Sequence, residues 1–167
     1  MDETQQQAEK KVFDLIRKIE VAQMVTVGGD GKLRSRPMVA KQDDFNGELW
    51  FFTSAGSGKI RELEGDAEVL LTYSDPSHQT YVSVEGEGAV VRDPQKIRDL
   101  WSEPMRVWFP KGQTDPDIAL VRVKVREATY WDAPSSAFVM AYGYAKAVTT
   151  GKRPNPGDVG HVDIGDR

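Results

Sequence analysis

The sequence predicts a mainly β (α+β) fold, an antiparallel β-barrel of six strands with peripheral helices. About six strand-like segments follow one another at short spacing, and turn residues rather than helices separate most of them. The chain has 167 residues, 39% of them hydrophobic, which suits one domain with a single core. A doubly wound α/β sheet is less favoured, because helices do not alternate with the strands.

Apolar or alternating runs bounded by turn residues define the strands. The predicted strands are residues 24–27, 33–41, 48–53, 68–73, 80–92 and 118–131. The first two form a hairpin, because the glycines in 28–31 allow a tight turn. Pro37 lacks an N–H group, so we expect an edge, a bulge or a cofactor-facing position there. Gly86 and Gly88 predict a bend or bulge in the fifth strand.

Helical spacing of apolar residues and capping residues define the helices. The predicted helices are residues 4–20, residues 57–63, a segment that opens at residues 93–94, and residues 137–148. Thr4, Ser57 and Asp93 are the expected N-caps, and Pro94 stands at the first helical position that proline favours.

One domain is predicted over residues 1–148, with the N-terminal helix included. Residues 149–167 are rich in Gly, Pro and Asp and have little apolar surface to bury, so we expect a flexible C-terminal tail there.

The composition disfavours several classes of function. The chain has no cysteine and two histidines, so we expect no disulfide, no thiolate nucleophile and no metal site. A net charge of −4 disfavours nucleic-acid binding. No apolar stretch has the length of a membrane span, and the N-terminus is polar and acidic. We therefore expect a cytoplasmic protein with neither a nucleic acid nor a membrane as partner.

Cations and small hydroxyl residues gather in two neighbouring segments. Arg36 and Lys41 lie on the second strand, while Ser57 and Lys59 lie where a helix begins. A phosphate group needs this combination of charge, hydroxyl donors and free backbone N–H groups. The alternative is that these residues are solvated cations on the barrel surface, which are common.

Other phosphate and catalytic motifs are absent from the sequence. A P-loop needs a glycine at position 53 and a Ser or Thr at position 60, where Thr53 and Ile60 stand. No dinucleotide-binding glycine pattern, GxSxG elbow or HExxH motif occurs. The sequence therefore marks out no catalytic side chain.

Three blocks resemble pyridoxamine 5′-phosphate oxidase in order and spacing. Residues 36–41 are similar to its Arg-x-Val-Leu-Leu-Lys block, and residues 52–59 to its Tyr-Thr-Asn-x-x-Ser-Arg-Lys block. Residues 81–86 are similar to its strand that ends in Val-Glu-Gly. Over residues 13–148 the chain looks most like the general stress protein branch of the FMN-binding split-barrel superfamily. Further similarity to that branch lies in residues 108–112, 115–117 and 130–132.

The resemblance implies a split barrel that binds FMN at the interface of a homodimer. It implies that Arg36, Ser57 and Lys59 hold the phosphate. The residues implied for the flavin ring, the ribityl chain or a bound substrate are Pro37, Met38, Val39, Lys41, Phe52 and Thr53. Tyr81 takes the position of a flavin-contacting glutamine. The resemblance also implies that Trp108 stacks on the flavin from the partner subunit; in the alternative interpretation Trp108 is a dimer or core aromatic.

Two departures from the oxidase bear on function. Gly58 replaces an arginine that contacts the phosphate, a loss that Arg34 or a backbone N–H could offset. The C-terminal Arg-x-His substrate signature of the oxidase is also absent. Vitamin B6 oxidase activity is therefore not expected.

The function that the resemblance implies is that of an FMN-binding general stress protein, a flavin-dependent oxidoreductase for a small-molecule substrate. One alternative is a non-catalytic flavin-binding or flavin-buffering stress protein. Another is a split barrel that binds a different ligand, such as a deazaflavin or haem.

Overall fold

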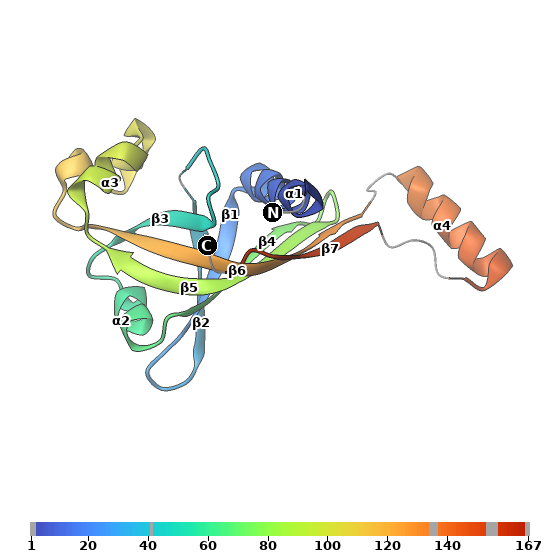
Figure 1. Cartoon of the computed structure of the whole chain (residues 1–167), viewed down its shortest axis with the longest axis horizontal. Helices are drawn as coiled ribbons and strands as arrows, with labels where there is room; N and C mark the ends of the chain where they lie inside the picture. The colour runs from blue at the N-terminus through green and yellow to red at the C-terminus, as the bar shows by residue number, and fades with distance from the viewer. Residues whose placement is uncertain (1–2, 41, 134–136, 153–156, 166–167) are drawn as a thin grey trace.

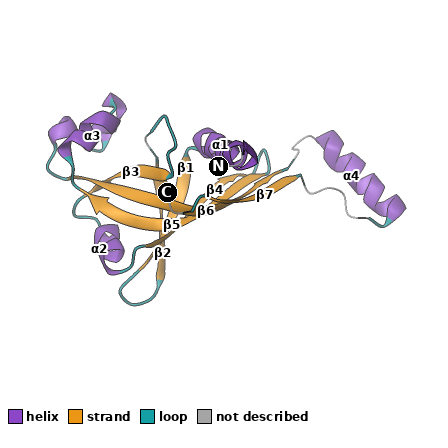
Figure 2. Cartoon of the chain, in the orientation of Figure 1, coloured by secondary structure: helices purple, strands orange, loops and turns teal. Residues whose placement is uncertain are grey.

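Antiparallel strands of one curved sheet form the body of the protein, and helices lie outside it (Figures 1 and 2). The computed structural model describes residues 3–40, 42–133, 137–152 and 157–165. The strands are β1 (Val21–Val27), β2 (Leu33–Val39), β3 (Glu48–Ser54), β4 (Glu68–Asp75), β5 (Thr80–Val91), β6 (Ile118–Asp132) and β7 (Asp158–Asp163). The helices are α1 (Glu3–Ile19), α2 (Gly58–Gly65), α3 (Pro94–Leu100) and α4 (Ala137–Thr150), with the short 3₁₀ helices η1 (Glu103–Val107) and η2 (Gly112–Thr114). The predicted split-barrel α+β class is confirmed.

The barrel is split between β2 and β3, which are the two ends of the strand order β2-β1-β4-β5-β6-β3. In the described part of the chain, a single bridge between Ala40, directly after β2, and Phe51 of β3 spans this split. The first half of β6 pairs with β3 and its second half pairs with β7. Helix α2 follows β3 and packs near β1 and β5, so it covers one end of the barrel.

Strand alternation and one face of α1 build the core. Phe51, Leu71 and Tyr73 are fully or almost fully buried inside the barrel. Val12 and Ile16 of α1 pack against this cluster, as the helical spacing of the sequence predicts. A second, smaller cluster lies on the opposite face of β3, under α3.

The caps of α2 and α3 differ. Asp93 accepts a hydrogen bond from the Gln95 N–H at 2.9 Å with Pro94 at the start of α3, so this predicted cap is confirmed. Ser57 stands at the N-cap position of α2, but its side chain makes no capping hydrogen bond.

The predicted bulge in β5 is confirmed. The register between β5 and β6 shifts between Glu85 and Gly86. A Cβ placed on Gly86 would lie 2.4 Å from the carbonyl oxygen of Lys124, so the close approach of the two backbones requires glycine.

The structure differs from the prediction of six strands followed by a flexible tail over residues 149–167. The seventh strand, β7, pairs with β6. Val162 and Ile164 are each 3% exposed and belong to the main core. Apolar residues are sparse in this segment, but the few present find a partner strand about thirty residues earlier in the chain.

Helix α4 stands apart from the sheet (Figure 1). Its described apolar side chains Met140, Tyr142, Tyr144 and Val148 are exposed. Among the described helices, none combines the length and apolar character needed to cross a bilayer.

Candidate functional site

Polar side chains meet on the inner face of the barrel at the end that α2 covers. Arg36 of β2 pairs with Met24 of β1 and lies on the same inward face as Met38. Thr26, two residues after Met24, is fully buried on that face. Glu62 reaches this group from α2.

Arg36 is bound by Glu62 and Thr26. Its Nη2 donates to Glu62 Oε2 and its Nη1 to Thr26 Oγ1, and the Thr26 hydroxyl donates to the same Glu62 oxygen. Longer bonds of 3.4 and 3.3 Å run from Nη1 to the carbonyl oxygens of Met24 and Arg34. The side chains of Arg36 and Glu62 are 20% and 12% exposed, so this ion pair is largely shielded from water.

The surrounding charges keep Glu62 ionised at neutral pH. Burial acts to raise the pKa of the Glu62 carboxyl. The hydrogen bonds from Thr26 and Arg36 and the charges of Arg36 and Arg34 outweigh burial, so this pKa lies below its ordinary value. Arg34 itself forms two hydrogen bonds of 2.9 Å with Asp30, so it is not the free cation that could replace the arginine missing at Gly58.

Lys59 forms the other half of the site. Its Nζ donates to Thr53 Oγ1 at 2.7 Å and to Ser57 Oγ at 3.2 Å, and the two hydroxyl oxygens are 3.3 Å apart. Burial lowers the pKa of Lys59, the charge of Arg36 lowers it further, and Glu62 acts in the opposite direction. The hydrogen-bond partners described for this ammonium group are thus neutral hydroxyls.

The start of α2 completes the donor set. The first N–H groups of a helix have no partner within it, and they lie at the positive end of its dipole. The uncapped Ser57 hydroxyl is turned toward Lys59. At Gly58 a Cβ would meet only Glu62 Oε1, at 4.0 Å, so the space beside the helix start is open. A cation, two hydroxyls and free N–H groups can together bind a phosphate.

The residues implied for the flavin ring divide between the two faces of β2. Met38 is buried in the core, whereas Pro37 and Val39 point outward. Pro37 lies in a strand at the end of the sheet order, which agrees with the edge position expected for it. Lys41 lies outside the described residues.

Phe52 and Thr53 point to opposite faces of β3. Thr53 faces the interior and contacts Lys59, whereas Phe52 packs in the second cluster. The Phe52 ring centroid lies 6.2 Å from that of Trp101 and 6.4 Å from that of Phe109. In one chain Phe52 is therefore a packing residue of that cluster.

Tyr81 and Trp108 lie away from the Arg36 group within one chain. Tyr81 is on the outer face of β5, three strands from β2, or roughly 14 Å across the sheet. Trp108 directly follows η1 and is 79% exposed. Within one chain, neither residue belongs to the group of side chains around Arg36 and Lys59.

Exposed apolar residues form a stripe across the outer face of the sheet. The strand register aligns Val39 with Val21, Tyr81 with Trp131, and Trp131 with Val159. Each of these side chains is between 38% and 47% exposed. The stripe spans roughly 24 Å from β2 to β7 and is interrupted at β4, where Ser74 aligns with Tyr81. It begins at Val39, which lies three residues after Arg36 on the same strand, β2.

Thr26 and Glu62 are the site residues that sequence reasoning missed. Thr26 alternates with the buried Ala22 and Met24, so a polar residue at an inward position was a signal. Glu62 follows Lys59 by three residues, a spacing that places both on one side of a helix.

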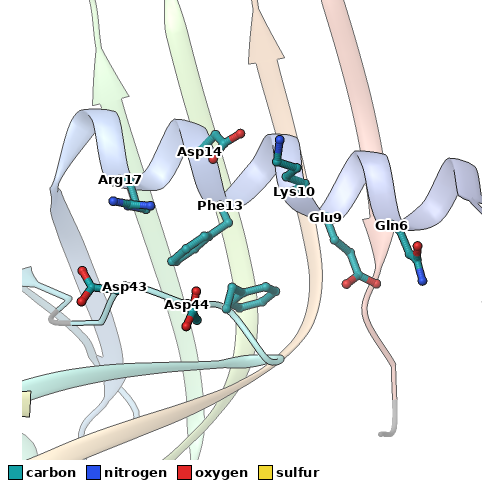
Figure 3. Close-up of a pocket in the computed structure, with 9 residues that line it drawn as sticks. Gln6, Glu9, Lys10, Phe13, Asp14, Arg17, Asp43 and Asp44 are labelled. Atoms are coloured by element: carbon teal, nitrogen blue, oxygen red, sulfur yellow. The ribbon is translucent and has the colours of Figure 1, made fainter. Parts of the chain in front are cut away.

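Two open grooves lie outside this site. One, of about 400 Å³, runs between α1 and the loop at residues 43–45 (Figure 3). In it the rings of Phe13 and Phe45 stack with their centroids 5.3 Å apart. The other, of about 600 Å³, is lined by Trp50, Lys96 and Trp101, among others. The lining of neither groove includes any predicted site residue.

Solved structures of other proteins share the fold. Structures of two such proteins superpose on the chain. A protein from Jannaschia sp. CCS1 assigned to general stress protein 26 has a TM-score of 0.72 and 23% identity, over 95% of this chain and 99% of that one. The general stress FMN/FAD binding protein from Xanthomonas citri has a TM-score of 0.69 and 28% identity, over 78% of this chain and 92% of that one.

A curated relative matches in sequence. Protein bli-3 from Neurospora crassa is 27% identical over 131 residues, which cover 73% of this chain. The chain spans 63% of the length of that relative and 34% of the length of a second one.

The match to a family model covers most of the molecule described above. The model described as pyridoxamine 5′-phosphate oxidase like matches residues 7–155, from α1 beyond the end of α4. The matched part contains the split between β2 and β3 and every residue of the Arg36 and Lys59 groups. The chain therefore belongs to the pyridoxamine 5′-phosphate oxidase-like family.

Proposed function

We propose that this protein is an FMN-binding general stress protein and a flavin-dependent oxidoreductase. The observation that carries the proposal is the Lys59 group, where an ammonium, two hydroxyls and the start of α2 converge on one point. This donor set suits a phosphate monoester. The flavin binding named for the similar Xanthomonas citri protein supports the same ligand class.

In this proposal Ser57, Lys59 and Arg36 bind the phosphate. The outward Pro37 and Val39 offer backbone and apolar surface to the flavin ring. Bound FMN would supply hydride or electron transfer, while the chain would bind and orient it. Vitamin B6 oxidase activity is not part of the proposal.

A second copy of the chain is the proposed partner. The apolar stripe of Val39, Val21, Tyr81, Trp131 and Val159 is wider than the scattered apolar residues normal on a monomer surface. Pairing across this stripe would bury it, and a two-fold arrangement would use the same surface on both copies. Tyr81 or Trp108 of one copy would then complete the flavin site of the other.

The non-catalytic alternative is a flavin-binding or flavin-buffering protein, with which the position of the two histidines is compatible. His78 pairs with Asp75 at 2.7 Å, and His161 lies 3.1 Å from Thr129, so both histidines are bonded elsewhere. The Arg36 and Lys59 groups thus contain no imidazole to transfer a proton near neutral pH. A flavin buffer needs the phosphate site but no such group.

The test is the visible spectrum of the purified protein after addition of FMN and desalting. A retained flavin spectrum supports the binding proposal, and a colourless protein contradicts it. Anaerobic addition of NADH or NADPH to the loaded protein then separates the two functions. Bleaching of the flavin absorbance is expected of the oxidoreductase, while an unchanged spectrum favours the buffer.

A further inference from the structure

A carboxylate lies among the cations that are proposed to bind the flavin phosphate. We propose that Glu62 is an internal competitor for this phosphate, which occupies Arg36 and thereby limits the preference of the site for phosphorylated flavins. This inference rests on the proposed function and assigns Glu62 as its specificity-determining residue.

The geometry gives Arg36 an anionic partner before any ligand arrives. Glu62 Oε2 accepts from Arg36 Nη2 and from the Thr26 hydroxyl, so the carboxylate is held in place from two sides. The guanidinium Nη1 is also engaged, by Thr26 and by backbone oxygens. A phosphate oxygen that binds Arg36 at Nη2 must therefore displace Glu62 from this nitrogen or share the nitrogen with it.

The balance of charge indicates that Glu62 competes with the phosphate for the cations of the site. Three cations surround the site, namely Arg34, Arg36 and Lys59. Asp30 pairs with Arg34 at 2.9 Å, and Glu62 pairs with Arg36 and lies 3.8 Å from Arg34. Three positive and two negative charges leave one net positive charge. A phosphate monoester carries a charge of about −1.5 to −2 near pH 7, so Glu62 leaves this ligand under-compensated.

Helix α2 places the competing groups side by side. Lys59 and Glu62 are three residues apart, on one side of the helix. The same helix therefore presents a cation that attracts the phosphate and a carboxylate that repels it. The charge of Glu62 acts on the phosphate and leaves the uncharged ring system of riboflavin little affected.

The test compares Glu62→Gln with the wild type, using FMN and riboflavin as probes. The amide keeps an oxygen for Arg36 and Thr26 but removes the charge. We expect FMN to bind roughly tenfold more tightly, the factor that one added charge-assisted hydrogen bond supports. Riboflavin affinity should stay within about twofold of the wild type, because riboflavin has no phosphate to gain from the lost charge.

Glu64→Gln is the matched control. Glu64 lies on the same helix and is exposed, and its substitution changes the net charge equally. This control should leave both affinities near wild type. A gain of the same size in Glu64→Gln would attribute the effect to net charge and overturn the assignment.

Unchanged or weaker FMN binding by Glu62→Gln would overturn the inference, and weaker binding would make Glu62 a positioning residue for Arg36. If Glu62→Gln does not fold, Glu62→Asp carries the test, because the shorter carboxylate withdraws from Arg36. Its FMN affinity should then exceed that of the wild type, and an equal or lower affinity contradicts the proposal.

Inorganic phosphate separates this inference from the proposed function. A wild type that binds phosphate but no flavin overturns the flavin proposal alone, and the same variants then decide the role of Glu62 with phosphate as the probe. If neither the wild type nor Glu62→Gln binds phosphate or FMN, both proposals fail.

Discussion

Arg36 and Lys59 carry the same charge but stand in different surroundings. Arg36 has an ionised partner in Glu62 and lies mostly out of water, whereas Lys59 is bonded to two hydroxyls. Removing Arg36 takes away the cation bonded to Glu62 and leaves Arg34, at 3.8 Å, as a more distant one. Removing Lys59 leaves hydroxyls that can bond to water or to each other. The two substitutions should therefore have different consequences for folding.

We expect Arg36→Ala to lower the free energy of unfolding by about 2 kcal/mol, less than a fully buried broken pair because this one is partly exposed. Lys59→Ala should lower it little. Lys59→Ala should weaken FMN binding by roughly 10- to 100-fold, the worth of one charged hydrogen bond. Urea denaturation and fluorescence titration measure the two quantities. If Arg36→Ala and Lys59→Ala have equal free energies of unfolding, the ion pair between Arg36 and Glu62 does not contribute to stability.

Gly58 offers a gain-of-function prediction at the residue scale. Open space surrounds this position, because a Cβ there would meet only Glu62 Oε1 at 4.0 Å. Gly58→Arg should fit, restore the arginine of the resembled block and tighten FMN binding by roughly tenfold. Gly65→Arg, at the other end of α2 and also in open space, is the matched control. Equal affinities for the two variants in a fluorescence titration would show that the added charge does not reach the phosphate.

The sequence singled out individual candidate residues but did not reveal which of them lie in contact. Charge and hydroxyl pattern singled out Arg36, Ser57 and Lys59, and the structure brings Lys59 and Ser57 into contact. Glu62 could not be identified, because the charge of a helix residue does not reveal which strand it faces. Its partner Arg36 lies 26 residues earlier, and only the closure of the barrel brings the two together.

At the scale of elements, local signals predicted most boundaries. Gly86 marked the bulge and Asp93 with Pro94 marked the start of α3, since both depend on backbone geometry within a few residues. Strand β7 was missed because its stability comes from non-local pairing with β6 and from two buried residues, Val162 and Ile164. A short polar segment carries no local signal of a partner strand elsewhere in the chain.

The bulge gives a prediction about β5. Gly86→Ala would place a methyl group 2.4 Å from the backbone oxygen of Lys124, and backbone cannot move aside as a flexible side chain can. We expect the free energy of unfolding to fall by about 2–3 kcal/mol. Gly29→Ala, in a turn with no atom within 4 Å of the added carbon, should be nearly neutral. Similar denaturation midpoints for the two variants would contradict the close approach.

At the scale of the whole molecule, the core is well packed but the surface exposes apolar side chains. The stripe across the sheet and the isolated face of α4 both expose apolar side chains. A lone helix of 14 residues gains little stability in water without a packing surface. The stripe and the helix thus both suit a protein that functions with a second copy beside it, as proposed above.

Trp131 lies in the stripe between two other members and provides the test of that assembly. It aligns with Tyr81 on one side and Val159 on the other, so a charge there would fall within the proposed contact. Burying an unpaired carboxylate in an apolar interface is strongly unfavourable. We therefore expect the wild type to be a dimer at micromolar concentration and Trp131→Glu to be a monomer, as measured by light scattering.

The same variant links assembly to function. If the partner supplies Tyr81 or Trp108 to the flavin site, monomeric Trp131→Glu should bind FMN at least roughly tenfold more weakly. The side chains proposed to bind the phosphate are unchanged in this variant. Leu33→Glu is the control, because Leu33 is 73% exposed at the start of β2 and lies outside the stripe. It should remain dimeric and bind FMN normally. A monomeric variant with undiminished FMN affinity would place the whole flavin site within one chain.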